Sequence, residues 1–156
     1  MNPPLPDPDL ARDRAPAAPG LVLDTNVVLD WLVFDNPSTR AFADAIRSAR
    51  VRWQVSASLR DELARVLVRG LRAAPGLDAA SVWRQWASWS NDTPAPAATA
   101  PVLHMRCTDA DDQKFIDLAV ACGARWLLSR DKAVLKLARP AAAMGLEIIT
   151  PDRWSC

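Results

Sequence analysis

The sequence predicts an α/β fold in which a central parallel sheet of about five strands lies between two layers of helices. Short apolar runs that end at turns alternate along the chain with longer amphipathic segments, an order typical of a parallel sheet covered on both faces. The 156 residues are enough for one domain with a substantial core and too few to suggest two. We therefore expect a single three-layer α/β/α sandwich.

The chain divides into a tail and one domain. Residues 1–19 are rich in proline and poor in large apolar side chains, which predicts a disordered tail. Residues 20–156 contain every expected element and are interpreted as one domain. We expect strands at residues 21–23, 51–55, 102–105, 126–128 and 146–149, with helices between them.

Composition and charge exclude several classes of protein. The longest apolar runs are short and interrupted by charge, so we expect no membrane span. The first residues lack the basic and apolar regions of a secretory signal, which favours a cytoplasmic protein. The three cysteines are odd in number and widely spaced, which predicts reduced thiols rather than disulfides or a zinc site.

Acidic side chains follow four successive expected strands. Asp24 ends the first strand, and Glu62 lies in the first turn of the helix after the second. Asp112 begins the helix after the third strand, and Asp131 ends the fourth. Because ligands of open parallel sheets bind beyond the carboxyl ends of the strands, we expect these carboxylates to lie close together.

Each acid also has a structural interpretation when it is taken alone. An acidic residue at the start of a helix, such as Glu62 or Asp112, is commonly a cap or a dipole partner. Asp131 could begin a turn, and Asp111 could complete a capping box with Thr108. An aspartate that directly follows an apolar strand has no such role in folding, so Asp24 is the residue that most strongly indicates a site.

The chemistry of such a site would depend on a cation. Clustered carboxylates repel one another unless a cation joins them, and hard oxygen ligands suit Mg²⁺ or Mn²⁺. The single histidine, His104, makes a histidine-based hydrolase an unsuitable interpretation. The net charge of +1 is weak evidence for a nucleic-acid partner.

The ordered set of motifs resembles the PIN-domain family, and especially members that are toxins of toxin–antitoxin pairs. The resemblance covers about residues 20–154 and rests on four motifs, which are Leu-Asp24-Thr25-Asn26, Ser56 with Glu62, Asp109-x-Asp111-Asp112-x-x-Phe115-x-x-x-Ala119, and Leu128-Ser129-Arg130-Asp131.

The resemblance implies an endoribonuclease that cleaves single-stranded RNA with a water molecule activated by Mg²⁺ or Mn²⁺. The implied catalytic and metal-binding residues are Asp24, Glu62, Asp112 and Asp131, supported by Asn26, Ser129 and Asp111. Asn26 and Ser129 would orient the acids by hydrogen bonds. The implied partners are an RNA substrate, a cognate antitoxin protein and a second copy of the chain in a homodimer.

Other functions remain open at this stage. A PIN domain can process RNA, or bind RNA or protein without activity, in the absence of an antitoxin. A receiver-like signalling domain would need paired acids after the first strand and a lysine after the last, whereas Asp24 stands alone and the last strand ends at Thr150-Pro151. A haloacid-dehalogenase-type phosphatase would need an aspartate at position 26, where this chain has Asn26.

Two further groups of residues have competing interpretations. Core packing is the first interpretation of Trp83, Trp86 and Trp89, followed by a dimer or antitoxin groove and then by stacking on RNA bases. Basic side chains that flank the expected site could hold an RNA backbone or could be ordinary solvated charges. These are Arg60, Arg106, Lys114, Arg130 and Lys132.

Overall fold

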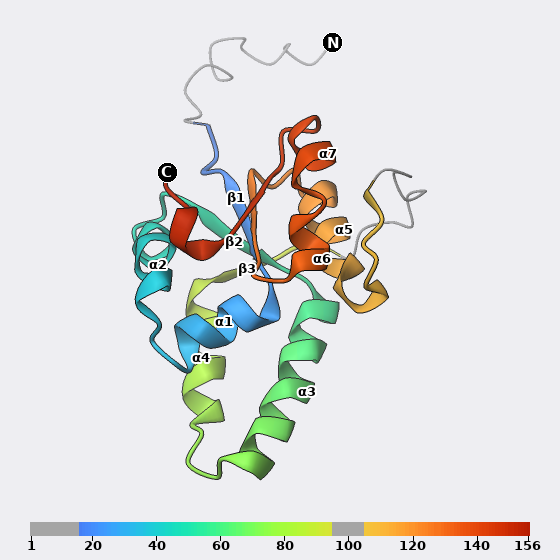
Figure 1. Ribbon diagram of the computed structural model, residues 1–156. Coiled ribbons are helices and arrows are strands. Elements are labelled where there is room, and N and C mark those ends of the chain that lie inside the picture. Colours follow the sequence, from blue (N-terminus) through green and yellow to red (C-terminus); the bar gives the residue numbers. More distant parts are fainter. Residues whose placement is uncertain (1–15, 95–104) are drawn as a thin grey trace, which may run out of the picture.

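The computed structural model describes residues 16–94 and 105–156. Its five strands form one parallel sheet in the order β3-β2-β1-β4-β5. The strands are β1 (Gly20–Leu23), β2 (Arg52–Val55), β3 (Ser90–Asp92), β4 (Trp126–Leu128) and β5 (Glu147–Ile149). Helices flank the sheet on two sides, with α2 on one side and α5 and α7 on the other (Figure 1). The predicted α/β architecture is confirmed.

The helices alternate with the strands along the chain. They are α1 (Thr25–Leu32), α2 (Arg40–Arg47), α3 (Ala57–Ala73), α4 (Ala79–Trp89), α5 (Gln113–Ala121), α6 (Lys132–Leu135) and α7 (Ala138–Ala142). Short 3₁₀ turns complete the list, namely η2 (Pro37–Thr39), η4 (Ala110–Asp112) and η5 (Pro151–Arg153). None of the helices in the described ranges is both long and apolar enough to cross a membrane.

Local sequence explains where several of these elements begin and end. The Asn36 side chain accepts a hydrogen bond from the Ser38 N–H at 3.0 Å, and Pro37 occupies the first position of η2. Gly123 ends α5 with a φ of 61°, a left-handed conformation that favours glycine. The expected tail of residues 1–19 falls mostly outside the described residues, and β1 begins at Gly20, one residue before the expected strand at 21–23.

The third strand lies elsewhere than the sequence predicted. We expected it at residues 102–105, but the strand beside β2 is Ser90–Asp92, directly after α4. Met105 lies in a helical turn, and residues 102–104 are outside the described residues. The strand at 90–92 is short and polar, so hydrophobic patterning does not reveal it. Backbone pairing places it at the edge of the sheet, where Thr93 N–H also donates to the Val55 carbonyl at 2.8 Å.

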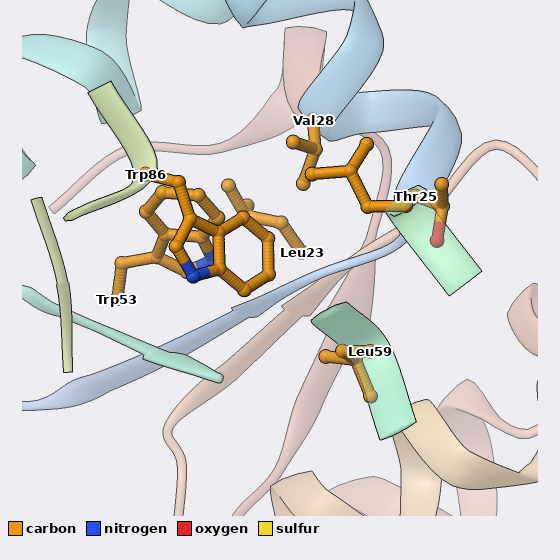
Figure 2. A pocket seen from close by; sticks show the side chains of 7 residues that line it. Leu23, Thr25, Val28, Trp53, Leu59 and Trp86 are labelled. Carbon is orange, nitrogen blue, oxygen red and sulfur yellow. The ribbon is translucent and has the colours of Figure 1, made fainter. Parts of the chain in front are cut away.

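Aromatic side chains fill the core between β2, α1 and α4. The ring centroids of Trp53 lie 5.3 Å from Trp31 and 4.9 Å from Trp86, both in edge-to-face geometry. Trp86 is buried, and Trp83 and Trp89 are partly buried against the same core. The narrow gap beside these rings has no room for a water molecule (Figure 2). The tryptophan segment therefore serves core packing, as the first interpretation proposed.

The order of the strands fixes where a site can form. β2 and β3 lie on one side of β1, and β4 and β5 lie on the other. The chain adds strands toward one edge of the sheet after β1 and toward the other edge from β4 onward, so the direction of winding reverses between β1 and β4. These two strands pair with each other, and Leu23 lies opposite Leu128. In open parallel sheets, ligands bind in the crevice outside the carboxyl ends of the strands at such a switch point.

Candidate active site

Asp24 lies at the switch point, at the carboxyl end of β1. Its backbone N–H donates to the Leu128 carbonyl at 3.0 Å, which continues the pairing of β1 with β4. Its carboxylate accepts from the Ser129 hydroxyl at 2.7 Å and caps α1 by accepting from the Asn26 N–H at 3.2 Å. Contrary to the expectation from the sequence, Asp24 thus has a role in folding, because α1 begins directly after it. The side chain is buried, with 3% of the residue exposed. Burial raises the pKa of Asp24, and the hydrogen bond from Ser129 opposes that rise.

Ser129 connects Asp24 to a second acid. The Ser129 hydroxyl, which donates to Asp24, accepts a hydrogen bond from the Asp131 N–H at 3.0 Å. Asp131 in turn caps α6, because its Oδ1 accepts from the Ala133 N–H at 2.7 Å. One buried hydroxyl therefore sets the distance between the turn after β1 and the turn after β4.

Asp112 is brought to the same place by a different element. It ends η4 at the start of α5, a helix that packs on β1 and β4. Burial raises the pKa of Asp112 from 3.8 to about 6, and the negative charges of Asp24 and Asp131 add to the rise. The Asp112 Oδ2 atom is buried and has no hydrogen-bond partner among residues 16–94 and 105–156. A carboxylate oxygen in that position is costly unless a cation or a proton satisfies it.

Glu62 approaches the site from the second turn of α3, not from the first turn as predicted, because the helix begins at Ala57. It is half of an ion pair. Its Oε2 contacts the Lys114 ammonium on α5, and each side chain is 21% exposed. The positive charge of Lys114 lowers the pKa of Asp24, while burial lowers the pKa of Lys114 itself. The negative charges of Asp24 and Asp131 raise the pKa of Asp112, so the structure brings these three acids close together, whereas Glu62 is bound to a lysine.

The supporting residues differ in what they contribute. Ser129 orients Asp24 through its side chain, whereas the exposed Asn26 contributes its backbone N–H. Asp111 is exposed, and the proposed capping box with Thr108 is not the cap that forms. Asp109 takes that role, accepting from the Asp111 N–H at 2.9 Å, because the tight 3₁₀ turn begins at Ala110, directly after Asp109.

Gln113 holds the approach to Asp112, a role that sequence reasoning missed. Its Oε1 accepts from the Cys107 N–H at 2.6 Å, and its Nε2 donates to the Met105 carbonyl at 3.0 Å. These contacts close the loop in front of η4. The hydrophobic periodicity of a sequence gives no information about a glutamine in this position, so the role of Gln113 could be recognised only from its contacts in the folded loop.

Arg130 holds the turn that carries Ser129 and Asp131. Its Nε lies 3.0 Å from an Asp30 oxygen on α1, and its Nη2 donates to the Ser38 hydroxyl at 2.6 Å. Sequence reasoning considered Arg130 only as a possible RNA contact. The structure shows that its guanidinium binds protein groups and ties the turn to α1 and η2.

The donor set suits a hard divalent cation. Within residues 16–94 and 105–156, no three acidic, histidine or cysteine side chains are arranged as a ready-made metal site. The available donors are nevertheless carboxylate oxygens from four elements, and Asp112 Oδ2 is buried without a partner. Carboxylate oxygens are the ligands that Mg²⁺ and Mn²⁺ prefer, so these residues fit such an ion.

The fold and these acids define a doubly wound α/β protein with an acidic site at its switch point. A protein-family model described as "PIN domain" matches residues 20–133. Among solved structures, the chain is similar to "VapBC2 from Rickettsia felis bound to a DNA fragment from their promoter". The TM-score is 0.55 at 12% identity, with 83% of this chain and 96% of that chain covered. The comparison with curated proteins found no match.

The chain belongs to the PIN-domain family, because the family match spans most of its length. PIN domains are generally nucleases that use divalent metal ions. The family match also excludes the receiver-like and phosphatase interpretations, because the domain that carries these acids belongs to a different family. The similarity to the Rickettsia structure supports the fold alone.

The raised pKa of Asp112 predicts how stability depends on pH in metal-free buffer. Between about pH 4, where an unfolded aspartate titrates, and about pH 6, the folded protein binds the extra proton. The free energy of unfolding of wild type should therefore fall relative to that of Asp112→Asn as the pH rises through this window. Above about pH 6 the difference between the two free energies should become constant. Urea unfolding at pH 4 to 8 measures the effect.

The matched control for this prediction is Asp117→Asn. Asp117 lies on the same helix and is exposed, and its Oδ1 accepts a hydrogen bond from Gln113 Nε2 at 3.0 Å, which an asparagine oxygen can also accept. Its substitution should leave the slope of stability against pH between 4 and 6 close to that of wild type. Equal slopes for wild type, Asp112→Asn and Asp117→Asn would contradict the assigned environment of Asp112.

Proposed function

We propose that this protein is an endoribonuclease that depends on Mg²⁺ or Mn²⁺ and cleaves single-stranded RNA. The observation that carries the proposal is the buried, unpartnered oxygen of Asp112 beside the carboxylates of Asp24 and Asp131. A cation at this place would satisfy that oxygen and cancel the repulsion among three acids. The family of the chain supports phosphodiester hydrolysis as the use of that cation.

Asp24, Asp112 and Asp131 would hold the ion, with Glu62 as a fourth acid. When bound, the ion lowers the pKa of a water molecule, orients it toward the phosphorus and stabilises the charge that develops on the phosphate oxygens. The chain's own groups fix this geometry. Ser129 holds the Asp24 carboxylate in place, and the cap of α6 holds the Asp131 carboxylate through its Oδ1.

The rigid surroundings of the acids would contribute by preorganisation. Asp24 and Asp131 follow strand ends and Asp112 lies at a helix start, and hydrogen bonds hold each of these turns, so little reorganisation is needed when substrate binds. Arg130 fixes one turn to α1, and Gln113 fixes the loop before Asp112. The proposed reaction therefore needs no large movement of the sheet or of α5.

We further propose that the protein is the toxin of a toxin–antitoxin pair, that it forms a homodimer and that it acts in the cytoplasm. The support for the toxin role is the motif set around Asp24, Asp112 and Asp131, together with the fold shared with VapBC2 from Rickettsia felis. In that structure VapBC2 is bound to a DNA fragment from their promoter. A cognate antitoxin is the protein partner that this role requires.

Substitution of the site acids tests the nuclease proposal. Asp24→Asn and Asp112→Asn should each lower the rate of cleavage of single-stranded RNA in Mn²⁺ by about 100-fold or more, because each removes charge that would hold the ion. Asp117→Asn is the control and should cleave like wild type, and a chelator should stop all cleavage. Undiminished cleavage by both Asp24→Asn and Asp112→Asn would contradict the assignment of these acids to the catalytic site.

Expression in cells tests the toxin role separately. Induction of the wild-type protein without a cognate antitoxin should arrest growth, whereas induction of Asp24→Asn to the same protein level should not. Growth curves and colony counts after induction provide the measurement. Normal growth with a purified protein that cleaves RNA would instead favour an RNA-processing enzyme.

A further inference from the structure

Lys114 brings a positive charge into the acidic site from α5. It lies two residues after Asp112, and its ammonium contacts Glu62 on α3. Both side chains are 21% exposed, so the pair is mostly shielded from water. An ion pair in such a position is screened less than a surface pair and acts more strongly on neighbouring charges.

The other basic groups near the site have different contacts. Arg130 binds Asp30 and Ser38, away from the carboxylates of the cluster. Arg60 lies over the Trp83 ring on α4, with 5.3 Å between its guanidinium carbon and the ring centroid. Lys114 is the cation whose charge acts directly on Asp24.

The positive charge of Lys114 offsets part of the negative charge of the acids. Without an ion, the carboxylates of Asp24, Asp112 and Asp131 repel one another, and one ammonium offsets part of that repulsion. When a divalent cation enters, the same ammonium becomes a like charge at short range. Glu62 cannot give its full charge to the ion while it is paired with Lys114.

We propose that Lys114 is a built-in counter-ion of the acidic site, which holds Glu62 in the ion-free protein and competes with the divalent cation for that carboxylate. This inference rests on the proposed metal-dependent function. Lys114 would then be a positioning residue that sets how much Mg²⁺ or Mn²⁺ is needed to fill the site. The geometry behind it is one contact between α3 and α5 at the edge of the cluster.

Titration of Mn²⁺ into RNA-free protein tests the proposal without a cleavage assay. Lys114→Met should bind Mn²⁺ about fivefold more tightly than wild type at pH 8, because it removes a like charge and frees Glu62. Free Mn²⁺ is measured by electron paramagnetic resonance. In the same ion-free state, Lys114→Met should unfold at a lower temperature than wild type, since its acids have lost their counter-ion.

Lys132→Met is the matched control. Lys132 is an exposed lysine directly after Asp131, so its substitution removes the same charge without breaking the pair with Glu62. Its Mn²⁺ affinity should stay within about twofold of wild type, because an exposed charge is screened by solvent. If Lys114→Met does not fold, Lys114→Gln keeps a polar side chain and should show the same tightening.

A double substitution separates an effect through Glu62 from a general change of charge. In a Glu62→Gln background, Lys114→Met should tighten Mn²⁺ binding less than it does when Glu62 is present. Unchanged or weaker binding by Lys114→Met and Lys114→Gln would overturn the counter-ion role while leaving the metal site intact. Absence of Mn²⁺ binding by wild type would overturn the counter-ion role and the proposed function together.

Discussion

The carboxylate of Asp24 is held inside the protein at the point where the strand order reverses, and the other parts of the site are arranged around it. Hydrogen bonds to a charged group contribute about 1.5–3 kcal/mol each, and Asp24 accepts them from Ser129 and from the Asn26 N–H. Moving a carboxylate out of water costs several kcal/mol. The pKa of Asp24 is raised, so the burial outweighs the hydrogen bonds. The fold therefore holds a carboxyl group whose charged form it does not fully stabilise.

The surrounding structure prevents the buried acids from moving apart or out into solvent. The Ser129 hydroxyl ties Asp24 to the turn of Asp131, and Arg130 ties that turn to α1. Asp112 arrives on α5, which is packed on β1 and β4 and cannot swing away without exposing its apolar face. Where local preferences conflict in a folded protein, the reason is commonly functional. Here a divalent cation is the simplest group that would relieve the repulsion, and Lys114 offsets part of it from within the chain.

The sequence predicted most of the sheet because β1 and β4 are apolar runs that are soon followed by an aspartate. Asp24 could be placed at the end of β1 in this way, and the periodicity of α5 placed Asp112 at the start of that helix, although the strand expected before it was wrong. The strand at 90–92 escaped prediction because it is polar and depends on backbone pairing at the edge of the sheet. The pairing of Lys114 with Glu62 could not be predicted, since it depends on how α3 and α5 pack in three dimensions.

The most direct test of this account is to locate the bound ion among the carboxylates by nuclear magnetic resonance. Mn²⁺ added in small amounts to ¹³C-labelled protein broadens the carboxyl signals nearest to it. The signals of Asp24, Asp112 and Asp131 should broaden first, before those of the exposed Asp61 and Asp117. Equal broadening of all five signals, or broadening of the exposed acids first, would contradict a single metal site at the switch point.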